Sequence, residues 1–323
     1  MDVIGFGAMN LDLVYQVKHI LLEGEATVKG FSQHAGGSAA NTVHALSRLG
    51  LKAGFLGAVG TDPEGAFLFE ECRGIGVDTR GLVAKVGATG RVLCITDERA
   101  HRALYVLPGG NDLLKSEDID LSYANRARLI HLSSFAGEEQ FELQKDLVAR
   151  LDPDIKVSFS PGSLYAPKGC TALLPILRRT QVLFANKREI EEMTGDEFTE
   201  GARDCLQHGC GAVVVTLGEG LAADEIGVRA ANPIVAYVVT AEEDHIIEAP
   251  AIVQDPAPDG IGAGDAFAAG FLFGFLRHKD LPTCGALGHL LATCALSGVG
   301  ARAGLPTLAE LDRKFREVYG KAL

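Results

Sequence analysis

The stretch Asp259-Gly-Ile-Gly-Ala-Gly-Asp265 stands directly before the apolar run AFAAGFLFGFL. The apolar run predicts a buried helix from about residue 263, and the glycines before it let backbone N–H groups approach a ligand closely. The first turn of a helix leaves N–H groups without intrahelical acceptors and carries the positive end of the helix dipole. This junction is therefore typical of an anion site, most often one for phosphate.

Asp265 needs a separate explanation, because a carboxylate beside an anion site repels the anion. One hypothesis is chemical: Asp265 accepts a proton from a hydroxyl that attacks a phosphoryl group. A raised pKa would not be needed, since the alcohol becomes acidic only late in the transfer. The alternative is that Asp265 only caps the helix, as Asp often does.

Polar residues also follow the first predicted strand, which spans residues 3–8. Asn10 and Asp12 have period-two spacing, so their side chains can face the same side, and Asp can accept hydrogen bonds from neighbouring hydroxyls, as on a sugar. A simple turn is the alternative. The segment Gly5-Phe-Gly7 lacks the third glycine and the later acidic residue of a dinucleotide-binding fingerprint, which disfavours that interpretation.

The order of the predicted elements indicates an α/β fold. From residue 128 strands and helices alternate, which predicts a mostly parallel sheet with helices on both faces, in a single domain over 1–323. A hairpin predicted over 91–107 and the irregular early segment interrupt this alternation. Segments 13–35 and 90–108 are therefore predicted to form a small β-sheet lid, which would exclude water when closed. Two long helices, from about 263 and 283, are expected to close the chain.

Composition excludes several classes of protein. The net charge of −12 disfavours nucleic acid as a partner, since such binding relies on Lys and Arg. The longest apolar runs are too short to span a bilayer, and the N-terminal residues do not resemble a signal peptide. Seven cysteines without a C-x-x-C pair are typical of reduced, mostly buried thiols in a cytoplasmic protein, rather than of a disulfide framework or a zinc site.

Several motifs taken together resemble the ribokinase-type sugar kinases, the PfkB carbohydrate kinase family, over essentially the whole chain. They are Asn10-Leu-Asp12, Gly36-Gly-Ser-Ala-Ala-Asn41, Gly57-Ala-Val-Gly-Thr-Asp62, Pro108-Gly-Gly-Asn111, Asn186-Lys-Arg-Glu189, Thr216-Leu-Gly218-Glu-Gly220 and Gly262-Ala-Gly-Asp265. The resemblance implies a three-layer α/β/α ribokinase-like sandwich with a small β-sheet lid. It also implies transfer of the γ-phosphoryl group of ATP to an alcohol.

The resemblance carries roles to individual positions. Asp265 matches the general base, and the backbone of Gly262, Ala263 and Gly264 matches the anion hole. The remaining positions are implied to bind substrate (Asn10, Asp12, Gly36, Gly37, Asn41 and Asn111), Mg²⁺ and phosphate largely through water (Asn186 and Glu189), and nucleotide (Thr216, Gly218, Gly220 and His289). His289 would lie near the adenine, although a lone histidine in a late helix is as often a core or surface residue.

One departure from the family pattern lies in the opening stretch. Many members carry Asp-Thr-Thr where this chain has Asp259-Gly260-Ile261. Backbone carbonyls of this loop often bind a monovalent cation in the family and need no hydroxyl, so K⁺ at Asp259 and Ile261 stays open. Family members often pair through the lid, which makes a homodimer an expectation here.

The sequence does not single out the phosphate acceptor. A small sugar of the ribose, fructose or keto-sugar type is the first hypothesis. A nucleoside is the second, because apolar lid residues such as Phe31, Leu93 and Leu104 could face a base. A phosphorylated sugar would need cations, for which Arg91 and Arg102 on the hairpin are candidates. A non-catalytic nucleotide-binding homologue is the remaining alternative.

Overall fold

The computed structural model describes residues 1–99, 101–222, 230–250 and 260–323 of the chain. A nine-stranded sheet forms its centre, in the order β13-β12-β11-β10-β9-β8-β1-β4-β5. The strands from β11 to β5 run parallel, and β12 and β13 add antiparallel strands at one edge. Their bounds are β1 Val3–Phe6, β4 Ala53–Gly60, β5 Asp78–Lys85, β8 Leu129–Ser133, β9 Lys156–Ser160, β10 Thr180–Asn186, β11 Ala212–Leu221, β12 Ile234–Thr240 and β13 Asp244–Glu248.

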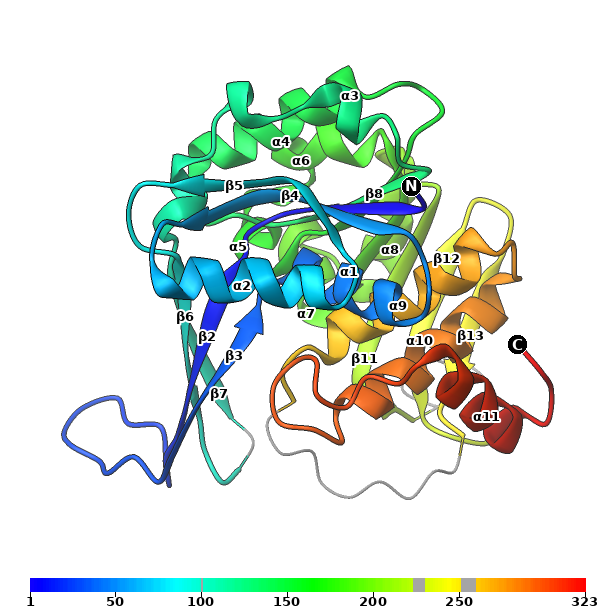
Figure 1. Cartoon of the computed structure of the whole chain (residues 1–323). Coiled ribbons are helices and arrows are strands. Elements are labelled where there is room, and N and C mark those ends of the chain that lie inside the picture. The colour runs from blue at the N-terminus through cyan, green and yellow to red at the C-terminus, as the bar shows by residue number, and fades with distance from the viewer. Residues whose placement is uncertain (100, 223–229, 251–259) are drawn as a thin grey trace.

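Helices cover both faces of this sheet, and a separate apolar core lies on each face (Figure 1). One core includes residues of α1 Ser38–Arg48, α2 Pro63–Gly74, α9 Ala263–Leu276, α10 Leu281–Ala295 and α11 Leu308–Tyr319. The other includes residues of α3 Leu121–Ala124, α4 Glu138–Arg150, α5 Gly162–Tyr165, α6 Gly169–Leu177, α7 Lys187–Thr194 and α8 Phe198–Gln207. Neighbouring strand residues such as Val3 and Ile4 belong to opposite cores, because successive side chains of a strand point to opposite faces.

A second, smaller sheet extends away from the helices and the large sheet (Figure 1). Its order is β3-β2-β6-β7, with β2 Asn10–Gln16, β3 Gly30–Gly36, β6 Gly90–Thr96 and β7 Arg102–Leu107. Strands β2 and β6 pair in parallel, and the other pairs are antiparallel. These strands match the predicted lid segments, so we call this sheet the lid sheet.

The predicted α/β class, the central parallel sheet and the small separate sheet are confirmed. Two details of the sequence interpretation are wrong. Asn10 and Asp12 do not form a turn, because they already belong to β2 and pair with Gly36 and His34 of β3. The chain does not close with the helix near residue 283, since α11 follows it and buries Leu311 and Phe315.

The seven cysteines are all buried, as predicted for thiols that fill the core. None of the helices in the described ranges combines the length and the apolar character needed to cross a membrane.

Candidate active site

The predicted site residues gather at one edge of the large sheet, beyond the carboxyl ends of its parallel strands. The chain enters β2 three residues after β1 ends, and β10 and β11 bring Asn186 and Thr216 side by side as register partners. The N-termini of α1 and α9 meet at the same edge through side-chain hydrogen bonds between them. Open parallel sheets bind their ligands at this edge, where loops and helix N-termini meet.

Asp265 lies in the first turn of α9, but it does not cap that helix. The N-cap is Gly262, in the left-handed region at φ 77°. Both carboxylate oxygens of Asp265 instead accept hydrogen bonds from α1: Oγ of Ser38 donates to Oδ1 across 2.7 Å, and Nδ2 of Asn41 donates to Oδ2 across 2.8 Å. The cap-only alternative for Asp265 is therefore wrong.

Opposing influences act on the pKa of Asp265. Burial raises its pKa, while the hydrogen bonds from Ser38 and Asn41 and the charges of Arg302 and Arg102 lower it, and the net direction is upward. A carboxylate oxygen has more than one lone-pair site, so each oxygen keeps capacity for a further donor. The prediction that Asp265 is a general base did not require a raised pKa. The raised pKa makes this carboxylate a stronger proton acceptor.

The glycines of the opening stretch play different structural roles. A Cβ built on Gly262 would lie 2.4 Å from Cβ of Ala301, so this position accepts only glycine beside the 299–303 loop. A Cβ on Gly264 would meet no atom within 4 Å, so the space beside the first turn of α9 is open. The first turn of α9 also leaves N–H groups without intrahelical acceptors and carries the positive end of the helix dipole, which are the features that bind anions at helix N-termini.

Asp12 lies on the face of the lid sheet that looks towards Asp265. It is 8% exposed, and burial together with the charge of Asp265 raises its pKa to about 7, although Arg302 lowers it. Gly36 allows this placement, since a Cβ at residue 36 would lie 2.1 Å from Oδ2 of Asp12. Gly37, at φ 98°, would similarly strike the carbonyl oxygen of Ala8 at 2.2 Å.

Asn111, predicted as a substrate-binding residue, is only 1% exposed. Its Oδ1 accepts from the backbone of Met9, and its Nδ2 donates to Oδ1 of Asn10 across 2.9 Å and to the carbonyls of Met9 and Pro108. The contacts of Asn111 orient Asn10, which itself lies at the start of β2 next to Asp12.

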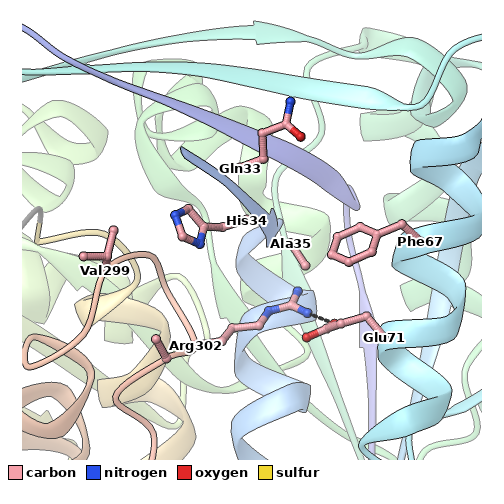
Figure 2. Close-up of a pocket in the computed structure, with 8 residues that line it drawn as sticks. Gln33, His34, Ala35, Phe67, Glu71, Val299 and Arg302 are labelled. Atoms are coloured by element: carbon pink, nitrogen blue, oxygen red, sulfur yellow. Dashed lines mark hydrogen bonds and ion pairs between the residues drawn. The ribbon is translucent and has the colours of Figure 1, made fainter. Parts of the chain in front are cut away.

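Arg302 connects the site to a neighbouring cavity. Its Nε donates to Oδ1 of Asn41 across 2.8 Å, its Nη1 pairs with Glu71, and its Nη2 donates to the carbonyl of Gly36 across 3.4 Å. Figure 2 shows Arg302 reaching from the 299–303 loop towards Glu71 on α2. A cavity of about 170 Å³ lies beside it, lined by Gln33, His34, Ala35, Phe67, Glu71, Val299, Arg302 and Ala303.

The Asn186-x-x-Glu189 motif forms a reciprocal capping box at the start of α7. Oδ1 of Asn186 accepts from the backbone of Glu189 across 2.9 Å, and Oε2 of Glu189 accepts from the backbone of Asn186 across 3.0 Å. Burial raises the pKa of Glu189, and the charges of Glu192 and Asp265 add to this. The carboxylates of Glu189 and Asp265 therefore lie within electrostatic reach of each other. Carboxylate and amide oxygens are ligands that suit Mg²⁺.

The other predicted nucleotide and ion positions are less closely connected to Asp265. Gly218 and Gly220 have positive φ in the end of β11, and space beside Gly218 is open. His289 lies on α10, where Nε2 is buried without a hydrogen-bond partner and burial lowers its pKa. Ile261 is half-buried, and Asp259 lies outside the described residues.

The strand register assigns the lid residues to two faces. Asp12, Val92 and Val106 share one face, together with Cys94, Leu104 and Arg102 further along the strands. Phe31, Leu93 and Arg91 lie on the opposite face, because they pair with Tyr15, Leu13 and Leu11. The prediction that Phe31 and Leu93 face the same ligand as Leu104 is therefore wrong, and Arg91 and Arg102 do not form one cationic pocket.

Arg102 and Arg91 also differ in their partners. Arg91 lies 2.7 Å from a carboxylate oxygen of Glu64 and 4.0 Å from Asp62. Nη1 of Arg102 donates to the backbone carbonyl of Gly260 across 3.0 Å, which ties the lid sheet to the glycine-rich loop. The ring of His34 on β3 packs close to Gly300 of the 299–303 loop, since a Cβ on Gly300 would lie 2.7 Å from it.

Ser38, Glu71 and Arg302 also belong to this cluster and were not predicted from the sequence. Ser38 could have been found, because it lies three residues before Asn41 and so shares a helix face with it. No local sequence pattern could have assigned Arg302 to the site, since it lies 261 residues from Asn41 in the sequence.

Carboxylate and amide groups beside the N-terminus of a helix are the groups that a phosphotransferase needs to bind an alcohol and a phosphate. Comparison with known proteins agrees with this class. The chain matches the family described as pfkB family carbohydrate kinase over residues 2–308. It therefore belongs to that family, and it is a kinase of the sugar and nucleoside type with an alcohol group as the phosphate acceptor.

Individual relatives carry different names. An uncharacterised sugar kinase of Archaeoglobus fulgidus is 35% identical, over 81% of this chain and 98% of that protein. An ATP-dependent ribose-1-phosphate kinase of Halopiger xanaduensis is 29% identical, over 88% of this chain and 90% of that protein. A nucleoside kinase of Methanothermobacter thermautotrophicus is 27% identical, over 99% of this chain and 97% of that protein. The crystal structure of ribokinase from Thermotoga maritima shares the fold, with a TM-score of 0.79 at 22% identity over 98% and 99% of the two chains.

Proposed function

We propose that the chain transfers the γ-phosphoryl group of ATP to a hydroxyl of a small sugar, with Asp265 as the general base. The observation that carries this proposal is the position of Asp265, which is fixed by α1, lies in the first turn of α9 and is electrostatically coupled to Asp12. Asp12, Asn10 and Asn41 supply the several polar groups that a polyhydroxyl acceptor needs.

The proposed mechanism depends on how the site positions the acceptor and on how it stabilises the charge of the transferring phosphoryl group. Asp12 and Asn41 hold the acceptor so that one hydroxyl lies in line with the γ-phosphorus, and Asp265 takes its proton as the oxygen attacks. The N–H groups at Gly262 to Gly264 and the dipole of α9 stabilise the negative charge on the transferring phosphoryl oxygens. Because the transition state is loose, this positioning and charge stabilisation account for most of the catalysis.

The nucleotide and its metal would occupy the neighbouring part of the edge. Thr216, Gly218 and Gly220 lie in the second half of β11, Asn186 ends β10, and Glu189 in the first turn of α7 lies within electrostatic reach of Asp265. Mg²⁺, when bound near Asn186 and Glu189, would neutralise phosphate charge. His289 is the proposed neighbour of the adenine, and K⁺ at the backbone of Asp259 and Ile261 stays a proposal.

A nucleoside is the second candidate, and the lid sheet supplies the observation that favours it. Leu104 shares the face of Asp12 and is 53% exposed, and Val92 and Val106 lie beside it on this face. An apolar face next to a sugar-binding carboxylate suits a flat base attached to the sugar.

An activity screen with ATP and Mg²⁺ over sugars, sugar acids, sugar phosphates and nucleosides tests the proposal, with ADP formation as the readout. Turnover of free sugars is expected, and turnover of nucleosides alone would overturn the first candidate. Leu104→Ser is the matching lid variant, with Leu93→Ser on the opposite face as its control. If a nucleoside is the acceptor, Leu104→Ser should raise its KM and Leu93→Ser should not.

A further inference from the structure

Asn41 stands between two groups that allow its amide only one orientation. Nε of Arg302 can only donate and an ionised Asp265 can only accept, so Oδ1 of Asn41 must face Arg302 and Nδ2 must face Asp265. The observed distances are 2.8 Å on each side. Arg302, in the 299–303 loop, therefore sets the orientation of the Asn41 amide beside the carboxylate of Asp265.

Arg302 is itself held rigidly. Its side chain is 9% exposed, and it contacts three different segments through Asn41, Glu71 and the carbonyl of Gly36. A planar guanidinium with five donors can meet three such partners at once, whereas an ammonium group cannot reproduce that geometry. The carbonyl of Gly36 belongs to the residue whose missing Cβ makes room for Asp12.

We propose that Arg302 is a positioning residue of the acceptor site, which orients the amide of Asn41 and brings one positive charge within electrostatic reach of the carboxylates of Asp12 and Asp265. This inference rests on the proposed function, because it assigns Asp12, Asn41 and Asp265 to the acceptor. It goes further by giving a role to a residue that belongs to none of the sequence motifs.

The positive charge of Arg302 also contributes to its proposed role, in addition to the hydrogen-bonding geometry of its guanidinium group. Its charge lowers the pKa of both Asp12 and Asp265. Arg102 acts on Asp265 from β7, and Glu189 of α7 lies within electrostatic reach of Asp265. On α1, His44 is held neutral by burial with a pKa of about 3, with Arg302 and Arg48 adding to this, and its Nδ1 lies 3.4 Å from Glu71. Within the part of the chain that the structure describes, Arg302 is a cation whose charge acts on both carboxylates.

Three substitutions separate charge from geometry. Arg302→Met removes both, and Arg302→Lys keeps the charge but loses the fork that binds Asn41 and Gly36. Glu71→Gln removes a carboxylate beside Arg302 and leaves its bond to Asn41 in place. The first readout is the titration of the Asp12 carboxyl carbon by ¹³C NMR, assigned by comparison with Asp12→Asn, which needs no substrate.

We expect the Asp12 titration to move up by roughly one pH unit or more in Arg302→Met, to stay near the wild-type value in Arg302→Lys, and to move down or stay unchanged in Glu71→Gln. The second readout is the acceptor kcat/KM, expected to fall at least about tenfold in both Arg302 variants because each loses the Asn41 contact. Thermal unfolding of each variant checks that the fold is kept.

An unchanged Asp12 titration in folded Arg302→Met would overturn the role of the charge. Full acceptor kcat/KM in Arg302→Lys would overturn the role in orienting Asn41. A failure of the proposed function looks different, since wild-type enzyme would then turn over no alcohol while the NMR titration still reported on Arg302.

Discussion

Oγ of Ser38 lies 2.7 Å from Oδ1 of Asp265, so the first residue of α1 holds a carboxylate in the first turn of α9. The two residues are 227 positions apart in the sequence. Together with Asn41, this contact points the carboxylate across the gap between the two helices rather than back onto its own helix. A side chain held in this way suits the proposed proton transfer, because its rotamer is already fixed before an acceptor binds.

We predict that Asp265→Asn lowers kcat by about 10²–10⁴-fold, the usual loss for a general base, and leaves the acceptor KM nearly unchanged. Steady-state kinetics measures both constants. Asp280→Asn is the matched control, because Asp280 caps α10 through the backbone of Thr283 and Asn caps equally well. Near-normal turnover of Asp265→Asn would contradict the assignment of the base.

The acceptor kcat/KM should fall as the pH is lowered through about 7, the value to which burial and Asp265 raise the pKa of Asp12. Below that pH the carboxyl is protonated and loses acceptor capacity for substrate hydroxyls. The pH dependence of kcat/KM reports ionisations of the free enzyme, so it is the correct measurement. A profile that stays flat from about pH 6 to about pH 8 would contradict it, because this interval brackets the pKa of about 7 and lies well above the ordinary Asp value.

Stability should depend on Asp12 in the opposite sense to activity. The folded pKa of about 7 exceeds the ordinary Asp value of 3.8, so the folded state binds the proton more tightly than the unfolded chain. The free energy of unfolding therefore decreases as the pH rises from about 4 to about 7. Asp12→Asn removes the buried charge, and its melting temperature should exceed that of the wild type at pH 8, with the difference vanishing near pH 4 in calorimetry. A lower melting temperature for Asp12→Asn at pH 8 would show that the charge is well compensated.

Gly36→Ala should raise the acceptor KM and lower kcat/KM by about 10²-fold, because the new Cβ would displace the carboxylate of Asp12. The matched control is Gly74→Ala in α2, where a Cβ meets no atom within 4 Å. That control should keep full activity and gain roughly 0.5–1 kcal/mol of stability, since Ala is the better helix residue. Equal kinetics in the two variants would exclude a steric role for residue 36.

The outer face of the lid sheet, opposite to Asp12, is predicted to pair with a second copy of the chain. Phe31, Tyr105 and Leu107 lie on this face and are 53%, 60% and 53% exposed. Charging the face with Tyr105→Glu and Leu107→Glu should convert a dimer into a monomer in sedimentation velocity, because burying a carboxylate in an apolar interface is costly. Leu104→Ser, on the inner face, is the control and should leave the oligomeric state unchanged. A monomeric wild-type chain would rule out this pairing.

Local patterns predicted a large part of the fold. The apolar run after Asp265 predicted α9, Asp62 before a proline predicted the start of α2, and the break in alternation predicted the lid sheet. Such features depend on neighbours within one or two turns of the chain. Whether Asn10 and Asp12 form a turn or belong to a strand was left open by the sequence, because a polar pair after a strand fits both, and only the pairing of β2 with β3 and β6 decides between them.

The sequence by itself determined the class of fold, the family and the positions of the motifs, because glycine-rich turns, strand periodicity and helix starts are local properties of the chain. Only the tertiary structure decided that Asp265 is held by Ser38 and Asn41 rather than capping α9, that Phe31 and Leu104 lie on opposite faces, and that Arg302 lies against Asn41. These relationships join residues from distant segments, and their burial and charge exist only once the sheet has brought those segments together.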